Sequence, residues 1–195
     1  METMSITARI VQEDCPDNPR EAWDNLGVMA CWHNRYNLGD VQPKCDPEEW
    51  LAENAPEGSV VLPLYLYDHS GITMSTSGFS CPWDSGQVGV IVATPEKIKE
   101  CWGTDAITDD IREKVTECLK GEVKVYDWFL TGNVWGYIIE QPSECCEHCG
   151  RGDGLEHVDS CFGFYGDGDD VLEQMMEHVE DAHHEALRAA WEARF

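Results

Sequence analysis

Hydrophobic and polar residues alternate along several stretches of this chain, and alternation with a period of two is typical of strands. The clearest examples are the apolar runs 59–68 and 87–94, which are bounded by Asp, Gly, Ser and Thr residues. Further strands are predicted over 5–14, 28–40 (where the strand runs into a polar turn), 133–141 and 156–166. We expect the last two to form a pair joined by a cysteine-rich loop.

Helices are indicated where a capping residue precedes apolar residues at helical spacing. Asp46 followed by Pro47, and Thr94 followed by a second proline, are N-cap and first-turn signals for two short helices. A longer helix is predicted to begin at Thr108. Gly121 and the β-branched residues after it leave the C-terminal half of that helix undecided between helix and strand.

Strands with helices between and after them indicate an α+β fold, an antiparallel or mixed sheet with helices packed on one face. We expect a core domain over 1–166, with a cysteine-rich loop at 142–157, and an acidic amphipathic C-terminal helix over 167–195, packed on or appended to that core. Hydrophobic residues make up 42% of the chain, which suffices for a core. The eight tryptophans are expected to supply large buried areas.

Charge narrows the range of partners, because 38 Asp and Glu against 13 Lys and Arg give a net charge of −25. Such a surface repels nucleic acids and anionic membranes, so we expect neither as a direct partner. It attracts a basic protein or a divalent cation instead. The competing interpretation is that the acidity serves solubility or reflects the proteome of the host. Oligomeric state is left open.

Targeting signals are not recognisable, since the stretch METMSITARIVQED lacks a basic start followed by an apolar core. The longest apolar run, VVLPLYLY, is much shorter than a membrane span. We therefore expect a cytoplasmic protein, in which the ten cysteines are reduced.

Reactive side chains gather between the apolar runs 59–68 and 87–94. His69 is a candidate base for a Cys81 nucleophile, with Asp84 or Asp159 orienting the imidazole and Asp68 beside it. Against catalysis, Cys81 precedes a proline and no helix begins directly after it to lower the pKa of its thiol. Asp, Ser and Gly in these positions also suit tight turns without any chemistry.

Carboxylates recur at the ends of predicted strands and could converge on one Mg²⁺ or Ca²⁺, which take oxygen ligands. Turn and cap chemistry is the competing explanation, because no complete calcium-loop motif is present. The residues in question are Asp24, Asp40, Asp68, Asp84, Asp127 and Asp159. The phosphate-binding, dinucleotide-binding and serine-hydrolase motifs are also absent from the sequence, which disfavours those enzyme classes.

The cysteine-rich loop has the spacing of one zinc knuckle, Cys146-x2-Cys149 followed by glycine. Cys145 and His157 are the other predicted ligands of a structural zinc ion that would pin the loop, and His148 and Cys161 are further local candidates. The competing interpretation is burial of the thiols as small hydrophobic groups.

The C-terminal helix is predicted to begin with Asp169 as its cap and to carry one apolar stripe. Its other residues include eight acids and no Lys or Arg between positions 167 and 185. Carboxylates at regular intervals on a rigid helix resemble the charge of a nucleic-acid backbone, which binds Lys- and Arg-lined grooves. The predicted partner-binding residues are Asp167, Asp169, Asp170, Glu173, Glu177, Glu180 and Asp181. A solvated helix face without a partner is the alternative.

Four segments together, CWHNRYNLGD, LPLYLYDHSGITMSTSGFSCPWDSGQVG, VYDWFLTGNVWGY and DSCFGFYG, resemble a family of small proteins from phages, prophages and mobile elements. The similarity covers about 17–166; the enlarged cysteine-rich loop and the acidic helix depart from the family's shorter pattern. The family has no established activity, so the resemblance implies a mobile-element context and a host-cell cytoplasm.

Three functions follow as hypotheses. The first is a non-enzymatic accessory protein that occupies a basic nucleic-acid-binding site on a host protein, such as a defence nuclease. The second is a hydrolase or transferase that uses the region of His69, Cys81 and Asp84. The third is a zinc-stabilised structural protein. The charge favours the first.

Overall fold

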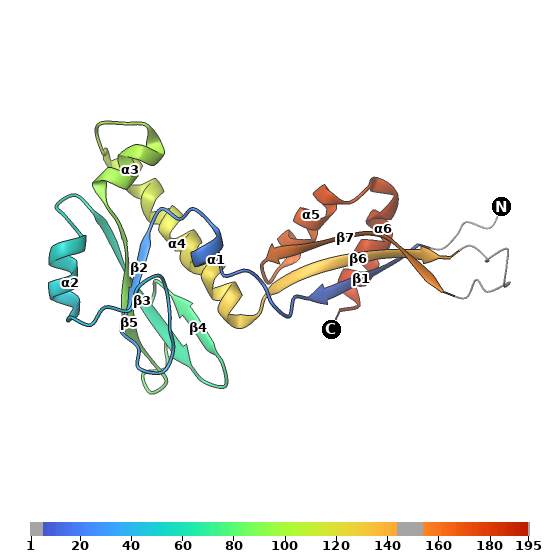
Figure 1. The fold of residues 1–195 in the computed structure, drawn as a ribbon, viewed down its shortest axis with the longest axis horizontal. Coiled ribbons are helices and arrows are strands. Elements are labelled where there is room, and N and C mark those ends of the chain that lie inside the picture. Colours follow the sequence, from blue (N-terminus) through green and yellow to red (C-terminus); the bar gives the residue numbers. More distant parts are fainter. Residues whose placement is uncertain (1–5, 144–153, 195) are drawn as a thin grey trace. The chain divides into compact units, whose positions relative to one another are not determined.

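The computed structural model describes residues 6–143 and 154–194, and its contacts divide the chain into two compact units (Figure 1). Residues 17–131 form one unit, which we call the inserted unit. Residues 1–16 and 132–195 form the other, which we call the flanking unit because it is built from both ends of the chain. Each unit is described by itself.

The inserted unit is built on a four-stranded antiparallel sheet in the order β2-β5-β3-β4. Its strands are β2 (Val28–Cys31), β3 (Val60–Asp68), β4 (Ile72–Ser75) and β5 (Ser85–Ala93). Its helices are α1 (Pro19–Ala22), α2 (Pro47–Asn54), α3 (Pro95–Trp102) and α4 (Asp109–Thr131). Among the described residues the two sheets of the protein are both antiparallel, which confirms the α+β class.

Strand alternation directs one set of side chains toward α4 and the other set toward α2. Leu64, Leu66 and Ile91 are buried in a core with Val115 and Leu119 of α4. On the opposite face, a smaller cluster joins Trp50 of α2 to the side chains of β2 and β5. The expectation of helices on one face therefore fails for this sheet, because α2 covers part of its second face.

The predicted caps of the short helices are confirmed. The Asp46 carboxylate accepts a hydrogen bond from the Glu49 amide at 3.0 Å, and the Thr94 hydroxyl accepts one from the Lys97 amide at 3.4 Å. Helix α4 continues to Thr131 through the stretch that the sequence left undecided.

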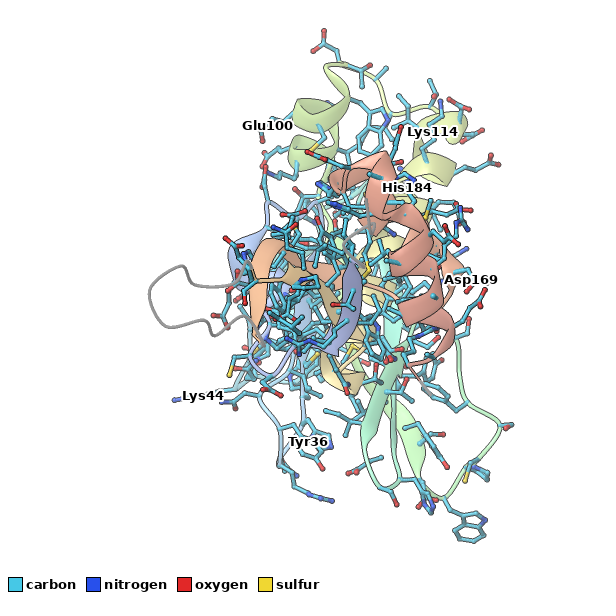
Figure 2. The ribbon with its side chains drawn as sticks, turned by 90° about the vertical axis from the view of Figure 1, so that its right-hand side faces the viewer. Tyr36, Lys44, Glu100, Lys114, Asp169 and His184 are labelled. Carbon is cyan, nitrogen blue, oxygen red and sulfur yellow. The ribbon has the colours of Figure 1, made fainter. Side chains whose placement is uncertain are left out.

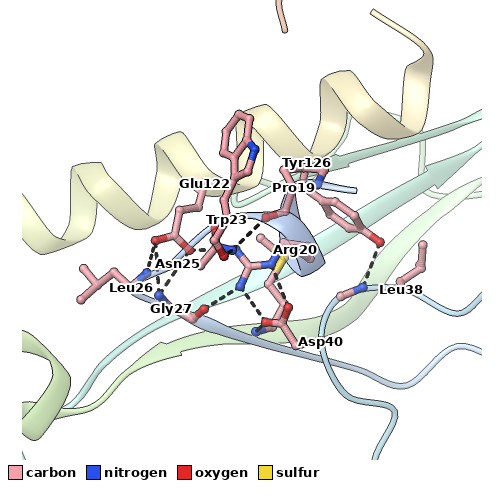
Figure 3. A network of polar contacts seen from close by, with 12 residues as sticks. Pro19, Arg20, Trp23, Asn25, Leu26, Gly27, Leu38, Asp40, Glu122 and Tyr126 are labelled. Carbon is pink, nitrogen blue, oxygen red and sulfur yellow. Dashed lines mark hydrogen bonds and ion pairs between the residues drawn. The ribbon is translucent and has the colours of Figure 1, made fainter. Parts of the chain in front are cut away.

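A buried ion network ties α1 and α4 to the sheet (Figure 3). The Arg20 side chain, 2% exposed, donates two hydrogen bonds to Asp40, at 3.0 and 2.6 Å, and one to Glu122 at 2.8 Å. A fourth goes to the Gly27 carbonyl at 2.6 Å. The Glu122 carboxylate also accepts the Leu26 amide at 2.7 Å. Because four of the five guanidinium N–H groups are bonded to an oxygen, and two carboxylates oppose the charge, this charge can remain in the interior.

The flanking unit is a three-stranded antiparallel sheet, β1-β6-β7, with two helices on one face. The strands are β1 (Thr7–Gln12), β6 (Val134–Pro142) and β7 (Leu155–Tyr165). The helices are α5 (Asp169–His178) and α6 (His184–Glu192), separated by the short 3₁₀ helix η1 (Asp181–His183). The predicted pairing of the last two strands is confirmed by the β6–β7 register.

The C-terminal segment is two helices rather than the single one expected. Val179 is extended and buried, and the chain turns there. A continuous helix of 25 residues would be about 38 Å long, whereas the turn lets Met175 of α5 and Leu187 of α6 enter one core. Asp169 is also not the cap of α5: Gly168 takes that position, and the Asp169 carboxylate accepts the Trp191 indole N–H at 3.0 Å.

The unit boundaries lie at residues 16–17 and 131–132, whereas the sequence analysis placed one boundary at residue 166. Strands β6 and β7 belong with the C-terminal helices, because Tyr137, Ile139 and Phe164 share a core with the apolar side chains of α5 and α6.

Candidate functional site

The segment predicted to carry chemistry is a turn followed by a loop that crosses the sheet. After β3 ends at Asp68, the chain reverses through Ser70, which has a φ of 60°, and the His69 amide bonds to the Gly71 carbonyl at 3.0 Å. Strand β4 then pairs with β3 on the side opposite to β5. The chain must therefore cross β3 within residues 76–84 to begin β5 at Ser85.

The crossing loop is held to β3 by rings and by hydrogen bonds. The Phe79 ring packs against the Tyr67 ring, with centroids 5.7 Å apart, and the Asp84 carbonyl accepts the Asp68 amide at 2.8 Å. The Ser85 hydroxyl bonds to the Cys81 carbonyl at the far end of the loop. These contacts explain why the segment contains so many Gly, Ser, Thr and Asp residues: the crossing requires sharp turns with satisfied backbone groups.

Asp84 is the centre of the predicted catalytic group. Its Oδ2 lies 3.3 Å from His69 Nδ1 and accepts a hydrogen bond from the Cys81 thiol, with a sulfur–oxygen distance of 3.7 Å. The structure therefore brings His69, Cys81 and Asp84 together, but with the imidazole and the thiol both facing one carboxylate. Within the described residues no hydrogen bond joins His69 to Cys81.

This arrangement lacks the direct contact between base and thiol that an activated cysteine needs, because His69 and Cys81 each face Asp84 and not each other. Asp159, the alternative orienting residue, instead accepts the Tyr137 hydroxyl at 3.0 Å in the flanking unit. That hydroxyl also reaches the His178 carbonyl at 3.3 Å, and burial, followed by the hydrogen bond to Asp159, raises the pKa of Tyr137.

Asp68, the fourth member of the predicted catalytic group, is engaged elsewhere. Its carboxylate forms an ion pair with Arg35 at 3.2 Å and accepts the Tyr36 hydroxyl at 3.3 Å. Tyr36 lies in the long connection between β2 and α2 (Figure 2). Asp68 thus anchors that connection to the end of β3 and does not take part in the His69–Asp84 contact.

Trp83 is the residue of this segment that the sequence analysis missed. Its side chain is 91% exposed, although tryptophans were expected to be buried. The sequence feature that could have indicated this exposure is the position of Trp83 between Pro82 and Asp84, two residue types that favour turns.

The recurrent aspartates do not converge. Asp40 is held by Arg20, Asp127 accepts the Thr73 hydroxyl at 2.6 Å and the Met74 amide at 2.7 Å, and Asp24 faces Lys97. Over residues 6–143 and 154–194, no three His, Cys, Asp or Glu side chains are grouped as metal ligands would be. The divalent-cation hypothesis therefore has no support in this part of the chain.

The zinc prediction stays a prediction. Cys145, Cys146 and Cys149 lie outside the described residues. The fourth predicted ligand, His157, is exposed on β7, where its Nε2 lies 3.0 Å from the Ser160 hydroxyl. The Cys161 thiol contacts the Phe162 carbonyl at 3.8 Å.

The seven predicted partner-binding carboxylates are all exposed, on α5 and the turns at its ends. Two of them have partners: Asp169 accepts the Trp191 indole, and Asp181 lies 3.7 Å from His184 at the start of α6 (Figure 2). For the other five, no ion pair with Lys or Arg is formed within the described chain. Among the apolar residues of α5, Val171 and Met175 are fully buried, Leu172 is buried, and Met176 is half-buried against the same core.

Comparison with protein-family models, with curated proteins and with solved structures found no significant match for this chain. No helix in the portions that the structure describes combines the length and apolar character needed to cross a membrane.

Proposed function

We propose that the protein is a non-enzymatic binder that presents the carboxylates of its flanking unit to a basic, nucleic-acid-binding surface on another protein. The observation that carries this proposal is that α5 has a buried apolar face and an exposed acidic face. Its apolar side chains are used by the core, while its carboxylates face solvent and, Asp169 excepted, form no hydrogen bond or ion pair with the side chains of the described residues.

The density of charge on α5 supports a resemblance to a phosphate backbone. The helix has ten residues, which corresponds to about 15 Å. It carries Asp169, Asp170, Glu173 and Glu177, or about one carboxylate per 4 Å of axis. A nucleic-acid strand has one phosphate per about 3.4 Å. A groove lined with Lys and Arg that accepts such a strand is therefore the kind of surface that this helix fits.

The charge of each unit also supports the assignment to the flanking unit. Its 80 residues carry 18 acids and four basic residues, a net charge of −14, whereas the 115 residues of the inserted unit carry 20 and nine, a net charge of −11. A strong field of one sign accelerates association with a partner of opposite sign. The resemblance to phage and mobile-element proteins suggests the partner's kind, a host nuclease or another DNA- or RNA-binding protein.

The test is a comparison of two charge reversals at equal net charge. One variant carries Glu173→Lys, Glu177→Lys and Glu180→Lys. Its matched control carries Glu53→Lys, Glu57→Lys and Glu113→Lys, three exposed acids of the inserted unit that form no ion pair in the structure. The assay measures inhibition of a panel of purified DNA-cutting nucleases, with DNA as the competing ligand, at 50 and 300 mM salt.

We expect inhibition of at least one nuclease, weakened about 10- to 100-fold by the first variant and little by the control. Higher salt should weaken it steeply, because opposite charges are screened. Inhibition that salt does not change, or equal losses in the two variants, would refute a carboxylate surface of this kind. No inhibition across the panel would count against nucleases as the partner class.

The enzymatic hypothesis has less support, because the Cys81 thiol faces a carboxylate. It makes a separate prediction: Cys81→Ala would abolish an activity that Glu173→Lys leaves intact. The zinc-stabilised structural hypothesis depends on cysteines outside the described residues and is compatible with the binder proposed here.

A further inference from the structure

A cavity of about 330 Å³ opens on the face of the inserted unit's sheet that carries α2, and none of the functions considered above uses it. It is lined by Trp32, Pro47 and the β5 residues Gln87, Val88, Gly89 and Val90. Its volume is at the small end of the range for ligand sites, which are usually apolar with a few polar groups. The lining of this cavity is mostly apolar, with one glutamine side chain, and so has the composition of a ligand site.

The aromatic wall of the cavity is fixed in place before any ligand arrives. The Trp32 indole N–H donates to the Cys45 carbonyl at 2.7 Å, and the Trp32 ring meets the Trp50 ring edge to face at 6.0 Å. The Trp32 amide bonds to the Val88 carbonyl at 2.7 Å. Because both the indole nitrogen and the backbone are already bonded, this ring offers a ligand only its apolar surface.

The strand below the cavity is irregular. Leu64 pairs with Gly89 and Tyr65 pairs with Gln87, so Val88 is the extra residue of a β-bulge. Bulges re-aim side chains and are common beside binding sites. Gly89 cannot carry a side chain, since a Cβ there would lie 2.3 Å from the Ala30 carbonyl oxygen and 3.0 Å from the Cys31 sulfur. Because of the bulge at Val88 and the missing side chain at Gly89, backbone atoms of β5 are accessible beside Trp32.

Gln87 supplies the polar group. Its side-chain N–H₂ makes one long hydrogen bond, 3.3 Å to the Gly89 carbonyl, and within the described residues its carbonyl oxygen accepts none. A ligand that lies against Trp32 and carries an N–H group can therefore bond to this oxygen. No Lys or Arg lines the cavity, and the chain's charge of −25 opposes an anionic ligand.

From this geometry we infer a binding site for an uncharged, planar nitrogen heteroaromatic ring of the nucleobase or nucleoside kind, stacked on Trp32 and hydrogen-bonded to Gln87. The same ring could come from a free nucleoside or from a base within a nucleic-acid strand. The net charge of −25 repels the polyanionic strand, so we select the free nucleoside. This inference is independent of the proposed function, because it concerns only the inserted unit.

The experiment titrates the intact chain with adenosine, guanosine, cytidine and uridine, and separately with a ten-nucleotide dA strand. Tryptophan indole N–H resonances are followed by NMR, and Trp32→Phe identifies the resonance of Trp32. We expect at least one nucleoside to saturate with a Kd of about 1 mM or tighter, to shift the Trp32 resonance and to leave that of the exposed Trp83 unchanged. The dA strand should not shift it.

Gln87→Leu should weaken nucleoside binding about fivefold or more, whereas Gln174→Leu, the same change on an exposed face of α5, should have no effect. The inference is overturned if no nucleoside saturates at 10-fold higher concentrations, or if binding leaves the Trp32 resonance in place. Equal effects of the two glutamine variants overturn it as well. Binding of the dA strand in preference to the nucleosides would overturn the choice of a free, uncharged ligand.

Discussion

Replacing Arg20 by methionine tests how much the buried ion network stabilises the inserted unit. The substitution removes four hydrogen bonds and leaves Asp40 and Glu122, whose side chains are 21% and 12% exposed, without their counter-ion. Removing one partner of a buried ion pair costs about 3 to 5 kcal/mol. Asp40 and Glu122 each still accept a hydrogen bond from a backbone amide, that of Met29 and that of Leu26 respectively. We therefore expect a loss of unfolding free energy at the lower end of that range, about 3 kcal/mol.

The matched control is Arg35→Met, which removes the same kind of side chain from an ion pair in which the arginine is 70% exposed. Exposed pairs contribute about 1 kcal/mol or less. Native-state hydrogen exchange of the buried β5 amides reports the opening of the inserted unit alone, which matters because the two units need not unfold together.

A loss of about 3 kcal/mol corresponds to about 150-fold faster exchange, against about fivefold or less for the control. If Arg20→Met accelerates exchange no more than Arg35→Met does, the network does not stabilise the fold and our reasoning is wrong. Burial lowers the pKa of Arg20, but the hydrogen bonds and charges of Asp40 and Glu122 outweigh it and raise the pKa, so Arg20 stays charged and the result should not depend on pH in the neutral range.

Three further predictions concern single side chains. Gly89→Ala should destabilise the inserted unit by several kcal/mol in chemical unfolding, because its Cβ would overlap a carbonyl oxygen of β2, whereas Gly86→Ala, which meets open space, should cost less than about 1 kcal/mol. Tyr137→Phe should cost about 1 to 2 kcal/mol, because the Asp159 carboxylate and the His178 carbonyl lose the hydroxyl that they share, and thermal unfolding measures it. Burial raises the pKa of Cys31 from 9.0 to about 12, so its thiol should resist alkylation at pH 8 while Cys15 reacts, as mass spectrometry of the labelled protein would show. The protonated Cys31 thiol stabilises the fold fully below pH 9, and that contribution should be lost as the pH rises toward 12, with a fall in unfolding free energy that alkaline titration detects.

Much of the secondary structure could be predicted because its signals are local. The Asp46 and Thr94 caps act on amides three residues away, and the alternation of β3 and β5 is visible in adjacent residues. The end of α4 could not be predicted, because Val123 and Tyr126 are poor helix formers that become favourable only when buried in the core.

In the predicted site, too, local features could be predicted and individual contacts could not. Sequence identified His69, Cys81 and Asp84 as neighbours, and they are, but it could not show that the carboxylate takes a hydrogen bond from the thiol. It also could not show the contact of Arg20 with Glu122, which is 102 positions away. Trp83 contradicts the rule that large apolar residues are buried, and that rule is a tendency with exceptions on exposed turns.

The route of the chain through the flanking unit has a consequence for synthesis. Strand β1 pairs with β6, and the amide of Glu13 reaches the carbonyl of Val134 at 2.8 Å, so the partner of the first strand is made about 120 residues after it. At 5 to 20 residues per second, a ribosome needs about 6 to 24 s for that stretch. Residues 17–131 are made within this interval and are complete just before β6, so their own contacts can form while β1 is still unpaired. The middle of the protein is therefore finished before its ends can meet.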